Sequence, residues 1–85
     1  MAEVPDVRVR FFAGARAAAG TRETTVAVHD ADSVADVLGR LSADRPALAR
    51  VVPACSFLLD GVSARADARL GDAVELDVLP PFSGG

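Results

Sequence analysis

The residue types best suited to chemistry stand together in the last seven residues, LPPFSGG (79–85). A C-terminal carboxylate has a pKa of about 3.3–3.7, so at neutral pH it is a poor electrophile until it is converted into an acyl-phosphate anhydride. Gly84 and Gly85 place no side chain beside it, which lets the backbone enter a narrow channel. Pro80 and Pro81 fix φ and favour an extended course. The stretch therefore predicts a chain end that works inside another protein's active site, with a frayed terminus as the alternative interpretation.

The sequence contains no loop of the kinds that bind nucleotide phosphates. It has neither a Walker-type Gly-Lys-Ser/Thr motif nor a G-x-G-x-x-G motif. Any ATP that such an activation uses, with its Mg²⁺, would therefore be bound by a partner, and no cofactor is expected on this chain. A chain that is itself the substrate of an activating enzyme would have this composition.

Two other groups of reactive residue types have structural explanations. Cys55 is in strand phase with Phe57, which predicts a buried structural cysteine rather than a nucleophile. His29, Asp30 and Asp32 lie just before a helix, where a turn and a helix cap explain them better than a metal site does. We therefore expect no metal site and no acid–base pair.

Size and composition limit the possible classes of protein. The 85 residues make one domain, with 51% hydrophobic and 25% charged residues, as in a compact globular chain. The net charge is −3 and no basic run is present, which argues against nucleic acid as a partner. The single cysteine gives no sign of an oxidising compartment, and no apolar run approaches the length of a membrane span. Since the N-terminal residues are unlike a signal peptide, a cytoplasmic location without membrane contact is expected.

Hydrophobic periodicity predicts one main helix and a set of strands. Strands are expected over 7–13, 21–30, 55–65 (two strands turning at 60–61) and 70–79, with a short helical turn over 14–20 and an irregular connection with a helical turn over 47–54. Ser33 is a natural N-cap, Asp36 completes a capping box, and an apolar stripe follows at i, i+3, i+4 and i+7. The predicted order β-β-α-β-β-β indicates a two-layer α+β domain whose second sheet face is left for solvent or a partner.

The first and last strands show complementary residues if they pair in parallel at the centre of the sheet. The outward residues then match at a constant offset: Arg8 with Glu75, Arg10 with Asp77, and Phe12 with Leu79. The last match is an apolar spot beside the point where the tail leaves, and Phe82 extends it. A charge-rimmed apolar spot is typical of a docking surface.

Three stretches resemble the MoaD/ThiS family of sulfur-carrier proteins, which are ubiquitin-like β-grasp domains. They are VRFFAGARAAAGT (9–21), the helix DSVADVLGRL (32–41) and LGDAVELDVLPPFSGG (70–85). The first is similar to the family pattern FFA-x-x-R-x-x-x-G, with Arg16 and Gly20 in place. The resemblance implies a β-grasp domain over 1–79, with a mixed sheet and one main helix on one face, and a flexible Gly-Gly tail over 80–85.

The resemblance also implies a function, with the molybdopterin synthase branch of the family closest. The Gly85 carboxylate would be adenylated by an E1-like, MoeB-like enzyme using ATP, and then take sulfur from a donor protein to become a thiocarboxylate. That form would dock on a MoaE-like large subunit and give its sulfur to a pterin precursor, so the chain alone is not an enzyme. Gly84 accompanies Gly85 at the reactive end. The residues implied in partner contact are Phe12, Arg16, Leu79, Pro80, Pro81, Phe82 and Ser83. Phe82 stands where a smaller aliphatic residue is more common.

Three alternatives stay open at this stage. The first is a sulfur carrier for thiazole, cysteine or another sulfur-containing product. The second is a ubiquitin-like modifier that ends in an isopeptide bond. The third is a binding module whose tail is never activated.

Overall fold

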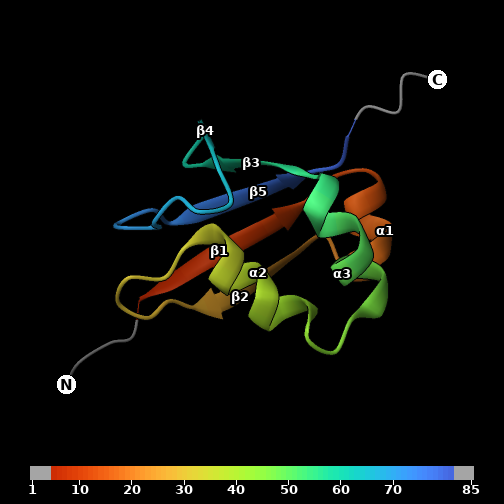
Figure 1. Ribbon diagram of the computed structural model, residues 1–85, viewed down its shortest axis with the longest axis horizontal. Coiled ribbons are helices and arrows are strands. Elements are labelled where there is room, and N and C mark those ends of the chain that lie inside the picture. The colour runs from red at the N-terminus through yellow and green to blue at the C-terminus, as the bar shows by residue number, and fades with distance from the viewer. Residues whose placement is uncertain (1–4, 82–85) are drawn as a thin grey trace.

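The computed structural model describes residues 5–81, so Phe82, Ser83, Gly84 and Gly85 lie outside the described residues. Within that range a five-stranded mixed sheet has the order β2-β1-β5-β3-β4. The strands are β1 (Asp6–Phe11), β2 (Glu23–Ala27), β3 (Ser56–Leu59), β4 (Val62–Ala64) and β5 (Glu75–Leu79). The helices are α1 (Gly14–Ala19), α2 (Val34–Ser42), α3 (Pro46–Val51) and the 3₁₀ helix η1 (Val52–Ala54). Figure 1 shows α2 and α3 lying across one face of the sheet.

The parallel pairing of the first and last strands is confirmed. β1 and β5 are neighbours at the centre of the sheet, with Arg8 opposite Glu75 and Arg10 opposite Asp77. Every other strand pair is antiparallel: β1 with β2, β3 with β4, and β3 with β5. The C-terminal ends of β1 and β5 therefore lie at the same end of the sheet.

The helix predicted after Ser33 is confirmed down to its cap. The Ser33 hydroxyl accepts a hydrogen bond from the backbone N–H of Asp36, and the Asp36 carboxylate accepts one from the backbone N–H of Ser33. This reciprocal pair satisfies N–H groups that have no partner within the helix. The stripe faces the sheet, with its four apolar residues buried: Val34, Val37, Leu38 and Leu41.

The segment after the main helix is more regular than the sequence predicted. The chain forms α3 from Pro46 and continues into η1, where an irregular connection with a helical turn was expected. Proline at the first helical position needs no N–H partner, so Pro46 starts α3 as well as preventing α2 from continuing. α3 packs against α1 at the C-terminal end of β1.

The core lies between the helices and one sheet face. Val7, Val9 and Phe11 alternate along β1 and are buried, as are Leu76 and Val78 of β5. Period-two alternation places these side chains on the same face of two adjacent strands. We call this side of the sheet the covered face, and the opposite side the open face.

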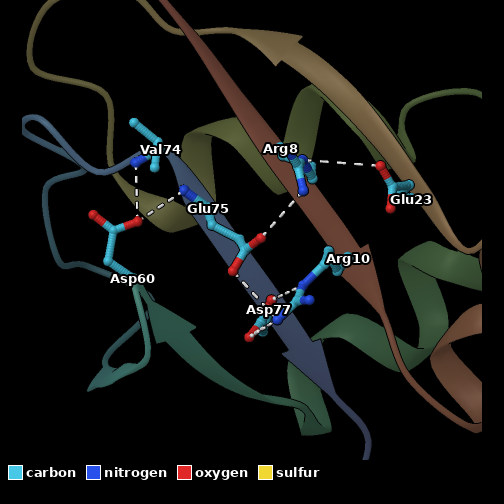
Figure 2. Close-up of polar contacts among 7 residues, drawn as sticks. All are labelled: Arg8, Arg10, Glu23, Asp60, Val74, Glu75 and Asp77. Carbon is cyan, nitrogen blue, oxygen red and sulfur yellow. Dashed lines mark hydrogen bonds and ion pairs between the residues drawn. The ribbon is translucent and has the colours of Figure 1, made fainter.

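The Asp60 carboxylate joins the turn between β3 and β4 to the start of β5. Asp60 has a φ of 48° and precedes Gly61 at 82°, which is the hairpin turn expected between β3 and β4. Its Oδ1 accepts hydrogen bonds from the backbone N–H groups of Val74 and Glu75, at 3.0 and 2.9 Å (Figure 2). The turn therefore holds the start of β5 in register.

None of the helices in the described part of the chain is long and apolar enough to cross a membrane.

Candidate functional site

The open face carries a ladder of opposite charges across its two central strands. The Arg8 guanidinium lies 3.6 Å from Glu75 and 3.9 Å from Glu23, and the Arg10 guanidinium lies 3.2 Å from Glu75 (Figure 2). The side chains of Arg8 and Glu23 are more than half exposed. Such exposed pairs stabilise the fold only slightly.

Arg10 and Asp77 form the tightest pair on that face. Arg10 donates from Nε to Asp77 Oδ1 at 2.8 Å and from Nη2 to Oδ2 at 3.1 Å. Asp77 is only 5% exposed, although it belongs to the open face. The hydrogen bond to Asp77 raises the pKa of Arg10 above its ordinary value, so the guanidinium stays charged. A planar guanidinium bound at two atoms is held in one orientation.

That orientation lays Arg10 over Phe12. The Arg10 Cζ atom lies 5.4 Å from the centre of the Phe12 ring, within the range of a cation–π contact. The backbone N–H of Phe12 donates to the carbonyl of Val78 at 3.2 Å, which continues the β1–β5 pairing past the end of β1. Phe12 is half-buried, as is Leu79 at the end of β5. The structure thus brings the two sequence-predicted apolar residues to the same end of the central strand pair.

Leu58 also lies on the open face, although the sequence alone did not single it out. It pairs with Asp77 in the β3–β5 ladder, so it lies on the same face, and it is half-buried. The alternation of β3 contained the signal, because Phe57 is buried on the covered face. Placing Leu58 also required the antiparallel pairing of β3 with β5. Phe12, Leu58 and Leu79 are called the apolar spot from here on.

The chain leaves β1 through a strained turn. Ala13 has a φ of 49° and a ψ of −124°, a conformation that residues with a Cβ atom rarely adopt. The backbone N–H of Ala15 donates to the carbonyl of Phe12 at 3.0 Å and closes the turn. The α1 helix that follows carries Arg16, whose side chain is exposed. The turn therefore sets where Phe12 and Arg16 stand relative to the sheet.

The tail begins at this same end of the molecule. β5 ends at Leu79, Pro80 is half-buried and Pro81 is exposed. Figure 1 shows β5 ending on the side of the sheet where α1 lies. The division of the chain into a domain over 1–79 and a tail over 80–85 stays a prediction, as do the roles of Phe82, Ser83, Gly84 and Gly85, which lie outside the described residues.

The remaining reactive groups sit apart from this end or in structural roles. Cys55 is half-buried rather than buried, and its thiol donates to the carbonyl of Val51 at 3.3 Å. Burial raises the pKa of that thiol, which disfavours the nucleophilic thiolate.

Asp32 accepts hydrogen bonds from the His29 backbone N–H at 2.7 Å and from Arg40 Nη2 at 2.7 Å. Across residues 5–81, no cluster of three or more His, Cys, Asp or Glu side chains is arranged to hold a metal ion.

Comparison with known proteins agrees with this geometry. The family model of the ThiS family matches residues 9–85. The chain belongs to the ThiS family. A protein named molybdopterin synthase sulfur carrier subunit, from Chlamydomonas reinhardtii, is 35% identical over 81 residues, covering 93% of this chain and 98% of that one.

Solved structures give the same fold. Small archaeal modifier protein 1 of Haloferax volcanii matches with a TM-score of 0.79 at 30% identity, over 94% of this chain and 99% of that one. Small archaeal modifier protein 1 of Methanosarcina acetivorans matches with a TM-score of 0.78 at 30% identity, over 99% and 100%. The expected ubiquitin-like β-grasp fold is confirmed, and the chain is a small sulfur-carrier domain of the MoaD/ThiS family.

Proposed function

We propose that this sulfur carrier is the small subunit of a molybdopterin synthase. The carboxylate of Gly85 attacks the α-phosphorus of ATP in the site of an E1-like, MoeB-like enzyme, and pyrophosphate leaves. A sulfur nucleophile at the oxidation level of sulfide, supplied by a donor protein, then displaces AMP and leaves a thiocarboxylate. This form docks on a MoaE-like large subunit, where its sulfur passes to a pterin precursor.

The observation that carries the proposal is the position of the apolar spot. Phe12 and Leu79 lie at the end of the central strand pair from which Pro80 and Pro81 lead the chain away. A partner that holds this spot receives the tail at a defined place. The 35% identity to a sulfur carrier subunit of molybdopterin synthase over nearly the whole chain supports the choice of pathway.

The proposal assigns a role to each of the residues at this end of the chain. Phe12 and Leu79, with Leu58, are the docking contacts, and Arg16 is a polar contact beside them. Pro80 and Pro81 direct the tail, while Phe82 and Ser83 line its entry into the partner. Gly84 and Gly85 reach the reacting centre, where a side chain would obstruct the channel.

Mass spectrometry of the full chain from its own cells tests the proposal. We expect a mass gain on Gly85 that corresponds to exchange of one oxygen for sulfur. Loss of this gain when the gene for the adenylating enzyme is deleted would place the activation in that enzyme. Deleting Gly85 should abolish sulfur transfer and leave the thermal unfolding midpoint unchanged. Sulfur transfer by the shortened chain would contradict the proposed chemistry.

A second candidate function is a ubiquitin-like protein modifier. Its support is the likeness, at 30% identity and over nearly the whole chain, to two proteins named as archaeal modifiers. In that case Gly85 would be found in isopeptide bonds to lysines of other proteins. All nine basic residues of this chain are arginine, so it offers no lysine to a second copy of itself. Proteomics would then find single copies of this protein attached to lysines of other proteins, and no polymers of linked copies.

A further inference from the structure

An open hollow lies directly beside Phe12 on the side of the sheet that carries β2. Its volume is about 570 Å³. It is lined by residues that include Arg10, Phe12, Arg16, Thr21, Arg22 and Glu23. The backbone N–H of Phe11 donates to the carbonyl of Arg22 at 2.9 Å, which brings the start of β2 next to the turn that follows β1. Two loops distant in sequence from the tail therefore form one wall beside the apolar spot.

The charges in this hollow are not balanced. Arg10 is neutralised by Asp77 and Glu75, and Glu23 lies 3.9 Å from Arg8. Arg16 and Arg22 are exposed, and neither has a carboxylate within 4 Å among residues 5–81. The hollow thus presents two uncompensated guanidinium groups on a chain whose net charge is −3.

We propose that Arg16 and Arg22 form a carboxylate-binding site that takes an acidic segment of the E1-like adenylating enzyme when that enzyme docks on the apolar spot. The inference rests on the proposed function and adds the chemistry by which the partner is recognised. Arginine is suited to this role because its planar, permanently charged head binds a carboxylate at two atoms. The apolar spot would form the dry centre of the interface, and this site its charged rim.

The surroundings favour a protein carboxylate over a polyanion such as nucleic acid. The acidic groups Glu23, Glu75 and Asp77 lie on the same face of the sheet as the hollow's edge, and the chain as a whole is acidic. A long run of phosphates would pass these carboxylates and be repelled, whereas one short acidic segment would reach the two arginines alone. Phe12 beside the hollow also suits a protein surface better than a free anion.

The test uses the full chain and the E1-like adenylating enzyme of the same organism. Adenylation of the chain is measured by ATP–pyrophosphate exchange. The double variant R16E/R22E should raise the KM for the chain about tenfold or more at low salt and leave kcat unchanged, because rim charges act on encounter and docking. The KM of the wild-type chain should rise with ionic strength, and that of the variant should rise less. R50E is the matched control, since Arg50 is an exposed arginine on α3 outside the hollow.

The outcomes separate this inference from the proposed function. If R16E/R22E and R50E give the same KM, the carboxylate site is wrong although adenylation stands. If the wild-type chain is not adenylated, the proposed function fails, and the site is then tested by NMR with a polyglutamate peptide. Shifts of the Arg16 and Arg22 Nε–H signals, with none at Arg50, would support it. Absence of these shifts, or equal shifts with inorganic phosphate, would overturn it.

Discussion

The two faces of β1 and β5 are formed by alternate residues of the same two strands, yet they have different functions. On the covered face Val9 and Leu76 lie opposite each other and are fully buried. On the open face the neighbouring positions hold Arg10 and Asp77, a bidentate ion pair. The difference shows that one pair of strands both stabilises the domain and presents a specific surface, because alternation separates the two tasks by a single residue.

Alanine substitutions at Phe11 and Phe12 give the strongest test of the difference between the two faces. Phe11 is 2% exposed on the covered face, so Phe11→Ala should lower the free energy of unfolding by about 3–5 kcal/mol through lost burial and the cavity left behind. Phe12 is half-buried at the open face, so Phe12→Ala should cost only about 1 kcal/mol but weaken partner binding. Urea unfolding and a binding titration measure the two effects. Equal losses of stability for both variants would refute the division of faces.

Asp77 gives the next largest effect, because it is a buried carboxylate on the open face. Asp77→Asn should lower the unfolding midpoint, since Arg10 loses its bidentate partner and is no longer held over the Phe12 ring. Glu75→Gln is the matched control on the same strand, with a more exposed carboxylate and longer contacts. Thermal unfolding should rank Asp77→Asn as the more damaging change. The reverse order would mean that burial of Asp77 does not set the strength of the pair.

A smaller effect is expected at the turn where the chain passes from Phe12 into α1. Ala13→Gly should raise the free energy of unfolding by about 1 kcal/mol, because glycine adopts the positive φ of 49° without strain. Ala17→Gly, at an exposed position inside α1, should instead lower it by about 0.5–1 kcal/mol. Denaturant unfolding of both variants checks the signs. A loss of stability in Ala13→Gly would show that the turn is not strained.

The smallest expected effect concerns the ion pair between Asp32 and Arg40. The hydrogen bond from Arg40 lowers the pKa of Asp32 to about 2, so the stabilisation by this carboxylate is present above its ordinary pKa and is lost as the pH falls toward 2. Wild type and Asp32→Asn should therefore differ most above pH about 4 and converge toward pH about 2. Unfolding midpoints across this range test the sign. Asp30→Asn, at an exposed neighbour, is the control.

The central strand pair could be predicted from the sequence because two independent patterns agree there. Alternation in 7–11 and 75–79 indicated the buried faces, and complementary charges selected the register that the structure has. The capping box at Ser33 likewise carried its own local signal. An element can thus be predicted from the sequence where two independent patterns agree on its position.

Other features needed the assembled chain. α3 was not recognised because Pro46 and Pro53 flank a segment too short to show a clear helical stripe. The burial of Asp77 could not be foreseen, because Arg10 covers it only once both strands are in place. Arg22 drew no attention in the sequence, since its place beside Arg16 depends on two loops that converge in space.

The parallel arrangement of β1 and β5 has a mechanical consequence. The start of β1 and the end of β5 lie at opposite ends of the strand pair, so a pull on Pro80 against the start of β1 acts along both strands. Such a force loads all the hydrogen bonds between them at once, instead of opening them one after another. An enzyme that draws the tail into its channel would therefore pull the domain in a direction that resists unravelling.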